Sequence, residues 1–233
     1  MKVYKDNAEI SIMDIKAVIY DVDGTLADSF PAIYQYWKDL CRENNRSFPF
    51  KDEFEARDTH SKMHNFTNFF EHIGFNWNLE RALIQECYNR TVGHANIPLF
   101  AGIDSVINSV ADKKILQGIA TDGTYEKTHN WLNKFPEFKS KFNSIITLSE
   151  QTPAKPDPTM LKNVAKELKV SCKHCIYVGD TKRDMIAARK AGMLPVGVSY
   201  GKFENPELLK RHTAFIVQSP AELVDLVKSL LAD

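Results

Sequence analysis

The chain has 233 residues, enough for one well-packed domain or for one domain that carries a smaller insert. Its 30 basic residues balance 30 acidic residues, so bulk charge gives no reason to expect a nucleic-acid or anionic-membrane partner. No stretch approaches the roughly 18 apolar residues of a membrane span, the N-terminal segment lacks the apolar region of a secretory signal, and the scattered cysteines fit a reducing compartment. We therefore expect a cytoplasmic protein with no membrane or nucleic-acid partner.

The first buried strand is predicted at residues 17–20, an apolar run that ends in the sequence DVDGT. The preceding segment, residues 1–14, is compatible with either an extra strand or a loose tail. Residues 30–96 carry helical periodicity and many aromatic side chains but no buried-strand run. We therefore expect a helical insert at residues 30–96, followed by a return segment that contains proline and glycine.

Short apolar runs alternate with helix-like segments from residue 97 onward. Strands are predicted at 115–120, 144–148, 175–178, 194–198 and 214–217. Helices are predicted at 102–112, 125–134, 158–169, 183–191 and 220–231, with Gly192 as a helix stop and Ser219-Pro220 as a helix start. This alternation predicts an α/β core, residues 1–29 and 97–233, with a parallel sheet covered by helices on both faces.

Polar side chains follow four of the predicted strands. They are Asp21 and Asp23, Thr121 and Asp122, Lys155, and Asp180 and Asp184. Because ligands of parallel sheets bind at the carboxyl ends of the strands, where the strand order reverses, we expect these side chains to form one site. Clustered carboxylates repel one another unless a cation is bound, and hard oxygen ligands are the preference of Mg²⁺.

A phosphoester bound to such a metal fits the remaining groups. Thr121 and Lys155 would supply hydrogen-bond donors and positive charge to the phosphate. Asp21 would attack phosphorus as a carboxylate nucleophile, and Asp23 would protonate the leaving oxygen and later activate water. This chemistry predicts an enzyme that acts on a small phosphorylated metabolite.

The same segments resemble the motifs of the haloacid dehalogenase (HAD) superfamily of phosphohydrolases. The stretch DVDGT is similar to its first motif, Thr121 to its second, Lys155 in KPDP to its third, and Gly179-Asp180 with Asp184 to its fourth, GDxxxD. The resemblance covers nearly the whole chain. It implies a Rossmann-like three-layer core with a mainly parallel sheet, interrupted after the first strand by an inserted helical cap.

The resemblance also implies roles for individual residues. Mg²⁺ would be held by Asp21, the backbone carbonyl of Asp23, and Asp180, with an aspartyl-phosphate formed on Asp21. Asp184 would orient Lys155 or a water on the metal, and Gly24 and Asp122 would join the phosphate-binding residues. Asp122 departs from the family pattern, in which Asn or Ser is more usual, so its carboxylate would have to turn away from the phosphate.

Within the superfamily, the chain looks closest to phosphoglycolate-phosphatase-like members. An aspartate at position 23 suits phosphoester hydrolysis, and it equally suits a β-phosphoglucomutase-like phosphosugar mutase. A catalytically idle relative that binds or regulates is a third reading. The sequence leaves open the physiological substrate and whether the protein is a monomer or a dimer.

Selectivity for the leaving group is expected to come from the helical insert. Its polar stretch at residues 57–64 would face the core, with Arg57, His60, Lys62 and His64 as the candidate contacts, unless it is a solvated helix face. Cys172 and Cys175 form a single CxxC pair without a second one, which favours structural thiols over a zinc site.

Overall fold

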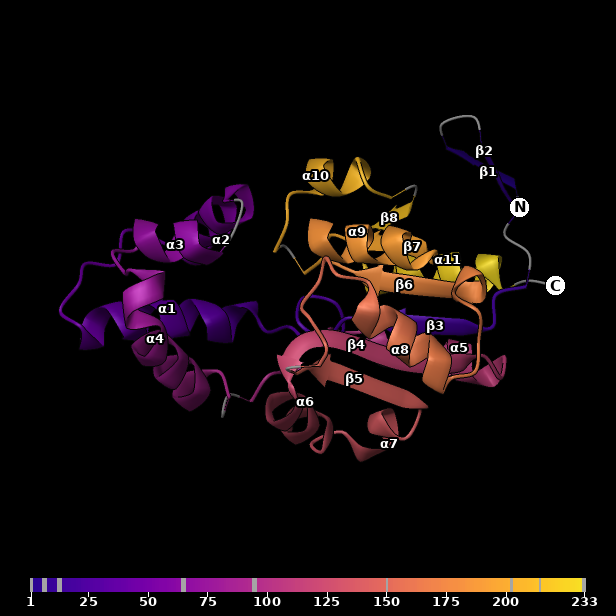
Figure 1. The fold of residues 1–233 in the computed structure, drawn as a ribbon, viewed down its shortest axis with the longest axis horizontal. Helices are drawn as coiled ribbons and strands as arrows, with labels where there is room; N and C mark the ends of the chain where they lie inside the picture. Colours follow the sequence, from indigo (N-terminus) through magenta and orange to yellow (C-terminus); the bar gives the residue numbers. More distant parts are fainter. Residues whose placement is uncertain are drawn as a thin grey trace.

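A parallel sheet forms the centre of the protein in the computed structural model (Figure 1). The structure describes residues 2–5, 8–11, 14–63, 66–93, 96–149, 151–201, 203–213 and 215–231. Within these residues, six strands lie in the order β5-β4-β3-β6-β7-β8, all parallel. Their bounds are β3 Ala17–Tyr20, β4 Leu116–Thr124, β5 Ser144–Leu148, β6 Cys175–Gly179, β7 Leu194–Val198 and β8 Phe215–Val217.

Helices follow the strands along the chain. They are α5 Ile103–Asp112, α6 Tyr125–Leu132, α7 Pro136–Lys139, α8 Thr159–Glu167, α9 Lys182–Ala191, α10 Pro206–Lys210 and α11 Pro220–Leu230, with a 3₁₀ turn at Cys172–His174. The predicted strands and the five longer helices are confirmed to within a few residues at their ends. The short α7 and α10 were not predicted, because four or five residues are too few to show a helical period.

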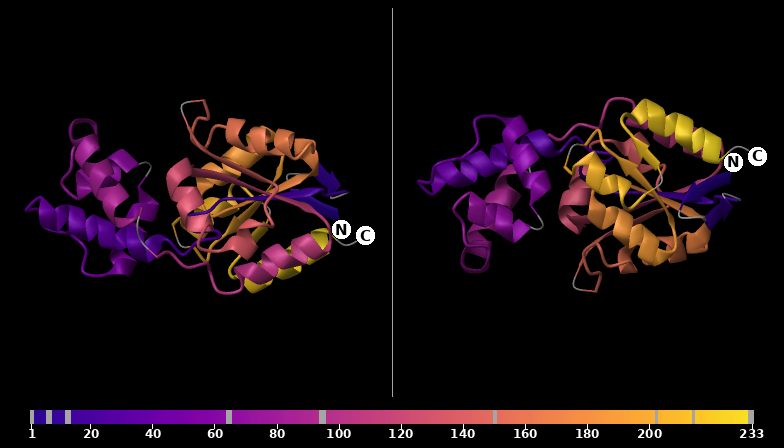
Figure 2. Two further views of the ribbon diagram at one scale, coloured as in Figure 1. Left: turned by 90° about the horizontal axis from the view of Figure 1, so that it is seen from below. Right: turned by 90° about the horizontal axis from the view of Figure 1, so that it is seen from above.

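The sheet is covered on both faces, with α5 and α11 side by side on one and α8 and α9 on the other (Figure 2). Strand β3 shows why short apolar runs mark the buried strands. Val18 and Tyr20 belong to the apolar core that includes α5 and α11, whereas Ala17 and Ile19 belong to the core beneath α8 and α9. Successive side chains of a strand point to opposite faces, so a strand covered on both faces is largely apolar. The predicted α/β fold is therefore confirmed.

Two helix boundaries that the sequence predicted rest on specific caps. Helix α9 begins with a capping box between Thr181 and Asp184 and ends at Gly192, whose φ of +78° favours glycine. Helix α11 begins at Ser219, whose hydroxyl accepts a hydrogen bond of 3.2 Å from the backbone N–H of Glu222. Both predicted boundaries are confirmed.

Between β3 and α5 the described chain is helical. Its helices are α1 Phe30–Glu43, α2 Glu53–Lys62, α3 Phe66–His72 and α4 Trp77–Thr91, which we call the helical insert. They lie together beyond the carboxyl ends of the strands (Figure 1). Aromatic side chains pack the helices against one another; the ring centroids of Trp37 and Phe69 are 4.2 Å apart, and Phe50 stacks on Phe69.

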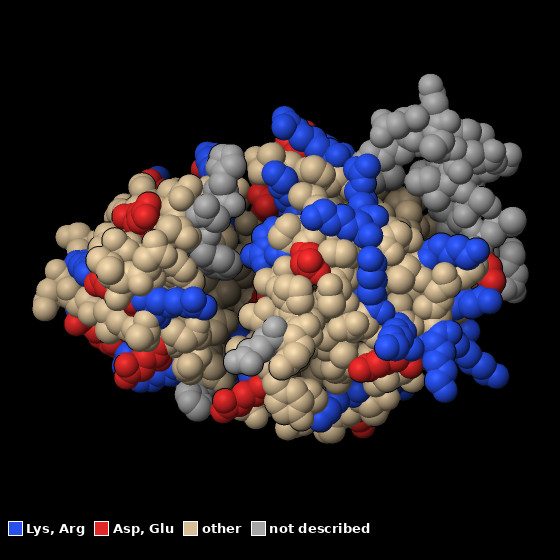
Figure 3. Space-filling model, viewed as in Figure 1, with Lys and Arg blue, Asp and Glu red and all other residues tan. Residues whose placement is uncertain are grey.

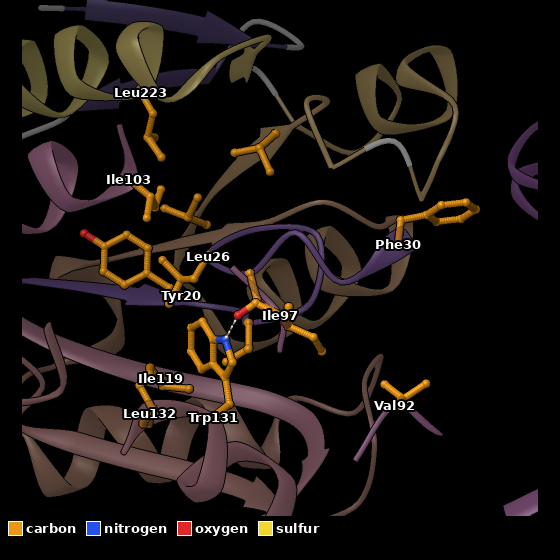
Figure 4. Packing of buried hydrophobic residues seen from close by; sticks show 14 of the residues in the cluster. Tyr20, Leu26, Phe30, Val92, Ile97, Ile103, Ile119, Trp131, Leu132 and Leu223 are labelled. Atoms are coloured by element: carbon orange, nitrogen blue, oxygen red, sulfur yellow. Dashed lines mark hydrogen bonds between the residues drawn. The ribbon is translucent and has the colours of Figure 1, made fainter. Parts of the chain in front are cut away.

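Apolar and polar contacts join the insert to the rest of the molecule. The indole N–H of Trp131 on α6 donates a 3.0 Å hydrogen bond to the carbonyl of Ile97, in the segment that returns from the insert (Figure 4). Phe30, at the start of α1, packs against Phe203 in the segment after β7, with the two ring centroids 5.1 Å apart. The insert is thus attached to the core by packed side chains as well as by the chain itself.

Of the two alternatives for the N-terminal segment, the described residues favour strand structure, although not within the main sheet. Strands β1 Lys2–Lys5 and β2 Ala8–Ser11 pair with each other in a separate antiparallel sheet. Across the described residues, no helix combines the length and the apolar character needed to cross a membrane.

Candidate active site

Asp21 lies at the point where the strand order of the sheet reverses. Strands β4 and β5 lie on one side of β3, and β6, β7 and β8 lie on the other. The backbone N–H of Asp21 donates a 2.9 Å hydrogen bond to the carbonyl of Val178, which holds Asp21 directly at the end of β3. This is the position at which open parallel sheets bind their ligands.

The turn after Asp23 depends on Gly24. Its φ is +76°, and a Cβ atom at this position would lie 2.2 Å from Oδ2 of Asp180. Gly201 crosses the same turn so closely that its own Cβ would lie 1.9 Å from the carbonyl oxygen of Gly24. Glycine is therefore required at both positions: at Gly24 by the positive φ and the neighbouring carboxylate, and at Gly201 by the backbone of the turn.

Lys155 connects two of the carboxylates. Its Nζ lies 2.9 Å from Oδ1 of Asp21, 2.6 Å from Oδ1 of Asp184 and 3.1 Å from the hydroxyl of Tyr177. Burial favours the neutral amine, but the charges of Asp184 and Asp21 outweigh it and hold the pKa of Lys155 well above its ordinary value. The site therefore holds a fixed positive charge next to Asp21.

Asp184 holds Lys155 in place and has both of its oxygens occupied. Oδ1 faces Lys155, while Oδ2 accepts hydrogen bonds from the backbone N–H of Thr181 at 3.0 Å and from its hydroxyl at 2.5 Å. Burial would raise the pKa of Asp184, but Lys155 and Thr181 outweigh it and lower the pKa. These contacts favour the expected role of orienting Lys155.

Asp180 differs from the other two carboxylates because the described part of the chain offers its charge no partner. It is fully buried, and neither of its oxygens has a hydrogen-bond partner among the described residues. One carboxylate oxygen from each of Asp21, Asp180 and Asp184 lies within 4.8 Å of the others. Burial, and next the charges of Asp184 and Asp21, raise the pKa of Asp180 well above its ordinary value. Burial likewise raises the pKa of Asp21, to about 7, against the opposing effect of Lys155.

These residues fit a divalent metal ion. A cation between Asp21 and Asp180 would give the unpartnered oxygens a ligand and would relieve the repulsion between the two carboxylates. Asp184, by contrast, already has its oxygens occupied by Lys155 and Thr181. The carboxylates left open to a divalent cation are therefore those of Asp21 and Asp180, and the identity of the ion as Mg²⁺ stays a prediction.

Asp23 is bound by a lysine that the sequence analysis missed. Oδ2 of Asp23 lies 2.7 Å from Nζ of Lys127 on α6, and the same Nζ donates to the hydroxyl of Tyr88 on α4 at 2.6 Å. Burial alone would raise the pKa of Asp23, but the charge and hydrogen bond of Lys127 outweigh it and lower the pKa. A lysine in an ordinary amphipathic helix gives no sequence signal of such a contact.

Thr121 lies in β4, and its neighbour Asp122 turns its carboxylate to other residues. Thr121 is buried, and its hydroxyl accepts a 3.2 Å hydrogen bond from the N–H of Gly123. Oδ1 of Asp122 accepts a 3.0 Å hydrogen bond from the backbone N–H of Lys155, and Oδ2 pairs with Arg183. Arg183 also donates from Nε to the Lys155 carbonyl at 2.8 Å.

This arrangement explains the unusual aspartate of the second motif. The carboxylate is neutralised by Arg183 and serves to fix the backbone of Lys155. Arg183 was not predicted, although it lies within the fourth motif, because it occupies one of the three positions that the motif GDxxxD leaves unspecified.

A family model supports the reading of these motifs. The model described as haloacid dehalogenase-like hydrolase matches residues 18–198. The chain belongs to this family. The expectation of a HAD-type hydrolase, and hence of an enzyme, is confirmed.

Relatives and solved structures similar to this HAD hydrolase extend the comparison to about nine tenths of the chain. The phosphoglycolate phosphatase of Xanthomonas campestris pv. campestris is 26% identical over 214 residues, covering 89% of this chain and 94% of that protein. The pyrophosphatase PpaX of Oceanobacillus iheyensis is 22% identical over 227 residues, covering 92% and 98%. The solved structure of a haloacid dehalogenase-like hydrolase from Streptococcus pneumoniae superposes with a TM-score of 0.77 at 20% identity, covering 91% of this chain and 98% of that one.

The candidate selectivity residues of the HAD hydrolase's insert lie in different surroundings. The guanidinium of Arg57 lies 4.3 Å over the ring of Phe30, and it pairs with Glu53 at 2.6 Å. His60 packs between Trp37 and Phe69 and reaches Phe203, with ring centroids 5.2, 5.1 and 6.4 Å away.

Lys62 and His64 do not share this position. Lys62 forms an exposed ion pair with Asp58, the arrangement of a solvated helix face, and His64 lies outside the described residues. His60 therefore reaches the core at Phe203, and Arg57 lies over Phe30, the insert residue that packs on Phe203. The contact of Lys62 is with its own helix.

Acidification is expected to destabilise the protein through His60. Burial lowers the pKa of His60 to about 4, whereas an unfolded histidine titrates near 6.5. Below pH ~6.5 the unfolded chain binds more protons, so the stability contributed by neutral His60 is fully present above this pH and is lost as the pH falls toward 4. Because the His60 side chain keeps some exposure to water, we expect the full effect to be reduced. Acidification from pH 7.5 to 4.5 should lower the free energy of unfolding by about 1–2.5 kcal/mol through His60.

Urea titrations at these two pH values would measure the effect. The carboxylates also titrate in this range, so the informative quantity is the difference between the wild type and His60→Gln, which should lose less stability on acidification. His72→Gln, at an exposed position at the end of α3, is the matched control and should behave as the wild type. Equal acid losses for all three proteins would contradict the assignment.

Proposed function

We propose that the chain is a Mg²⁺-dependent phosphatase that hydrolyses a small-molecule phosphomonoester of the phosphoglycolate type through an aspartyl-phosphate on Asp21. The observation that carries the proposal is that three groups lie together at one edge of the sheet. They are the Asp21 carboxylate, the buried oxygens of Asp180, which have no partner among the described residues, and Nζ of Lys155, which lies 2.9 Å from Oδ1 of Asp21. A nucleophilic carboxylate, a cation site and a fixed positive charge are the parts that phosphoryl transfer requires.

The reaction proposed for these residues has two steps. In the first, a carboxylate oxygen of Asp21 forms a bond to phosphorus while the bond from phosphorus to the leaving oxygen breaks, and Asp23 gives that oxygen a proton. In the second, Asp23 takes a proton from water as the water oxygen attacks phosphorus, which releases phosphate and restores the Asp21 carboxylate. Lys155 and the hydroxyl of Thr121 would bind the phosphoryl oxygens throughout.

Asp21, Asp180 and the backbone carbonyl of Asp23 are the residues that would hold Mg²⁺. When bound, the metal supplies positive charge to the phosphoryl oxygens, so that the carboxylate can approach an anionic phosphate. Gly24 brings its turn against Asp180, where a side chain would displace the carboxylate.

The helical insert, residues 30–96, would serve as a cap domain over this site. Its helices lie beyond the carboxyl ends of the strands (Figure 1), and the surface is hollowed where they meet the rest of the molecule (Figure 3). Arg57 and His60, near this junction, are the residues proposed to influence leaving-group selection.

The four cysteines are in keeping with a cytoplasmic location, because none of them forms a disulfide bond. They are Cys41, Cys87, Cys172 and Cys175.

The proposal is tested by phosphate release from the purified protein with Mg²⁺ and with EDTA. The substrates are p-nitrophenyl phosphate and a panel of phosphorylated metabolites that includes phosphoglycolate, pyrophosphate and sugar phosphates. Mg²⁺-dependent release supports the phosphatase, and no release from any substrate overturns it in favour of an idle relative. Transfer of the phosphoryl group from Asp21 to a hydroxyl of glucose 1-phosphate, giving a bisphosphate instead of free phosphate, would instead identify a phosphosugar mutase.

Asp23→Asn is expected to lower kcat by about 10²–10⁴-fold, because an amide can neither protonate the leaving oxygen nor activate water. The rate of the first step should fall more for alkyl phosphates than for p-nitrophenyl phosphate, because the nitrophenolate leaving group needs little protonation. Steady-state assays on both substrates measure this difference. If the variant turned over at the wild-type rate, Asp23 would not be the residue that transfers the proton.

A further inference from the structure

Lys127 and Tyr88 form a polar contact between the core and the helical insert. Lys127 lies on α6, which packs against β4 and β5, whereas Tyr88 lies on α4 of the insert (Figure 1). Nζ of Lys127 is 2.6 Å from the Tyr88 hydroxyl, 2.7 Å from Oδ2 of Asp23 and 5.3 Å from the centroid of the Tyr88 ring. The Lys127 side chain is only 12% exposed, so its charge is largely removed from water.

Two hydrogen-bond donors at this contact have no acceptor among the described residues. An ammonium group carries three N–H bonds, and the contacts with Asp23 and Tyr88 use two of them. The Tyr88 hydroxyl accepts from Lys127, and the described structure gives its own O–H no acceptor. A charged donor and a neutral donor 2.6 Å apart match an oxyanion, which can accept from both.

The contact lies on the leaving-group side of the site. In the proposed function, Asp23 faces the leaving oxygen, and Lys127 is bonded directly to Asp23. The other two cations of the site face elsewhere: Lys155 lies between Asp21 and Asp184, and Arg183 pairs with Asp122. Lys127 is therefore the cation placed next to whatever is attached to the leaving oxygen.

We propose that Lys127 and Tyr88 bind an anionic group, a carboxylate or a second phosphate, on the leaving part of the substrate a few bonds from the scissile oxygen. This inference rests on the proposed function and narrows its substrate class to phosphomonoesters with an acidic leaving part. Because one donor comes from the core and the other from the insert, the anion would bridge the two and hold the insert against the site.

A turnover experiment compares phosphoglycolate with ethyl phosphate, in which a methyl group replaces the carboxylate. In the wild type, kcat/KM should favour phosphoglycolate. Lys127→Met removes the charge at nearly constant length and should lower the ratio of the two kcat/KM values by about 10–100-fold, the effect of one charge-assisted hydrogen bond. Tyr88→Phe removes only the hydroxyl and should lower the ratio by about 3–10-fold. The ratio of the two kcat/KM values is the readout, because Lys127 also contacts Asp23. Loss of that contact affects both substrates alike and therefore cancels in the ratio.

Matched controls are Lys210→Met and Tyr125→Phe, exposed positions on α10 and α6, which should keep the wild-type ratio. If Lys127→Met and Tyr88→Phe also leave the ratio within about twofold of the wild type, the assignment of the subsite is wrong.

A binding experiment separates failure of the subsite from failure of the proposed function. The probes are 3-phosphonopropionate and propylphosphonate, in which a methylene replaces the scissile oxygen of the two substrates, titrated calorimetrically with Mg²⁺. The wild type should bind the carboxylated probe at least about 10-fold more tightly, and Lys127→Met should lose this preference. A Lys127-dependent preference in a protein without turnover would keep the subsite and overturn the phosphatase. Turnover without any preference, or binding of neither probe, would overturn the subsite.

Discussion

Asp21→Asn is expected to reduce Mg²⁺-dependent turnover by at least about 10⁴-fold, as expected for the loss of a covalent nucleophile. The amide has nearly the same shape as the carboxylate, but it is a poor nucleophile and lacks the charge that binds a metal ion. Steady-state phosphate release from p-nitrophenyl phosphate and from the best metabolite measures the loss. Mg²⁺-dependent activity above a trace in the purified, folded variant would contradict the assignment of Asp21 as the nucleophile.

The fold of this variant should survive the substitution. Asp21 is buried close to Asp180 and Asp184, and removing one of three neighbouring negative charges relieves repulsion in the metal-free protein. Lys155 still has Asp184 as its partner. Urea unfolding without Mg²⁺ should therefore give a midpoint no lower than that of the wild type. Asp104→Asn, an exposed position in the first turn of α5, is the matched control and should retain full turnover.

Lys155→Met is expected to lower the unfolding free energy by about 3–5 kcal/mol and to abolish measurable turnover. Without the ammonium, Asp21 and Asp184 are left buried with no opposing charge, which is the costly way to break a buried ion pair. The phosphoryl group would also lose its fixed cation. Urea titration in EDTA measures the stability, and phosphate release with Mg²⁺ measures the activity.

A second variant keeps this prediction testable if Lys155→Met does not fold. Lys155→Met combined with Asp184→Asn removes the cation and one of the carboxylates it neutralises, so it should be more stable than Lys155→Met alone. Lys210→Met, which breaks an exposed ion pair, should change stability by less than about 1 kcal/mol. If Lys155→Met alone were as stable as Lys210→Met, Lys155 would not be the group that neutralises the buried carboxylates.

Local sequence patterns were enough to predict the sheet and four of the strand ends that supply the site. A strand covered on both faces is largely apolar, and a carboxylate or a Gly-containing turn directly after such a run is visible within a few residues, as at Asp21 and Asp180. The partners of these groups were not visible. Lys127 lies 104 residues from Asp23 and 39 from Tyr88, and neither separation leaves a trace in the local pattern.

The orientation of the helices in the insert could not be predicted from the sequence either. Helix α2 has the sequence EFEARDTHSK, which lacks a continuous apolar stripe, so the period that predicts a helix cannot predict which side faces the core. His60 reaches the core at Phe203 and Arg57 lies over Phe30, whereas Lys62 pairs with Asp58 in solvent, and sequence alone could not separate them. The orientation of the Asp122 side chain was equally undetermined, because it depends on Arg183 from another strand end.

The crossing of Gly24 and Gly201 has a mechanical consequence. The segment after β7 contacts the insert through Phe203, which touches Phe30 and is reached by His60, and it rests on the turn that carries Asp23. At that crossing the two backbones meet with no side chain between them, so the turn after Asp23 has no room to move toward Gly201. We therefore expect the placement of Asp23 to be sensitive to how Gly201 is seated, and through Phe203 to how the insert lies against the core.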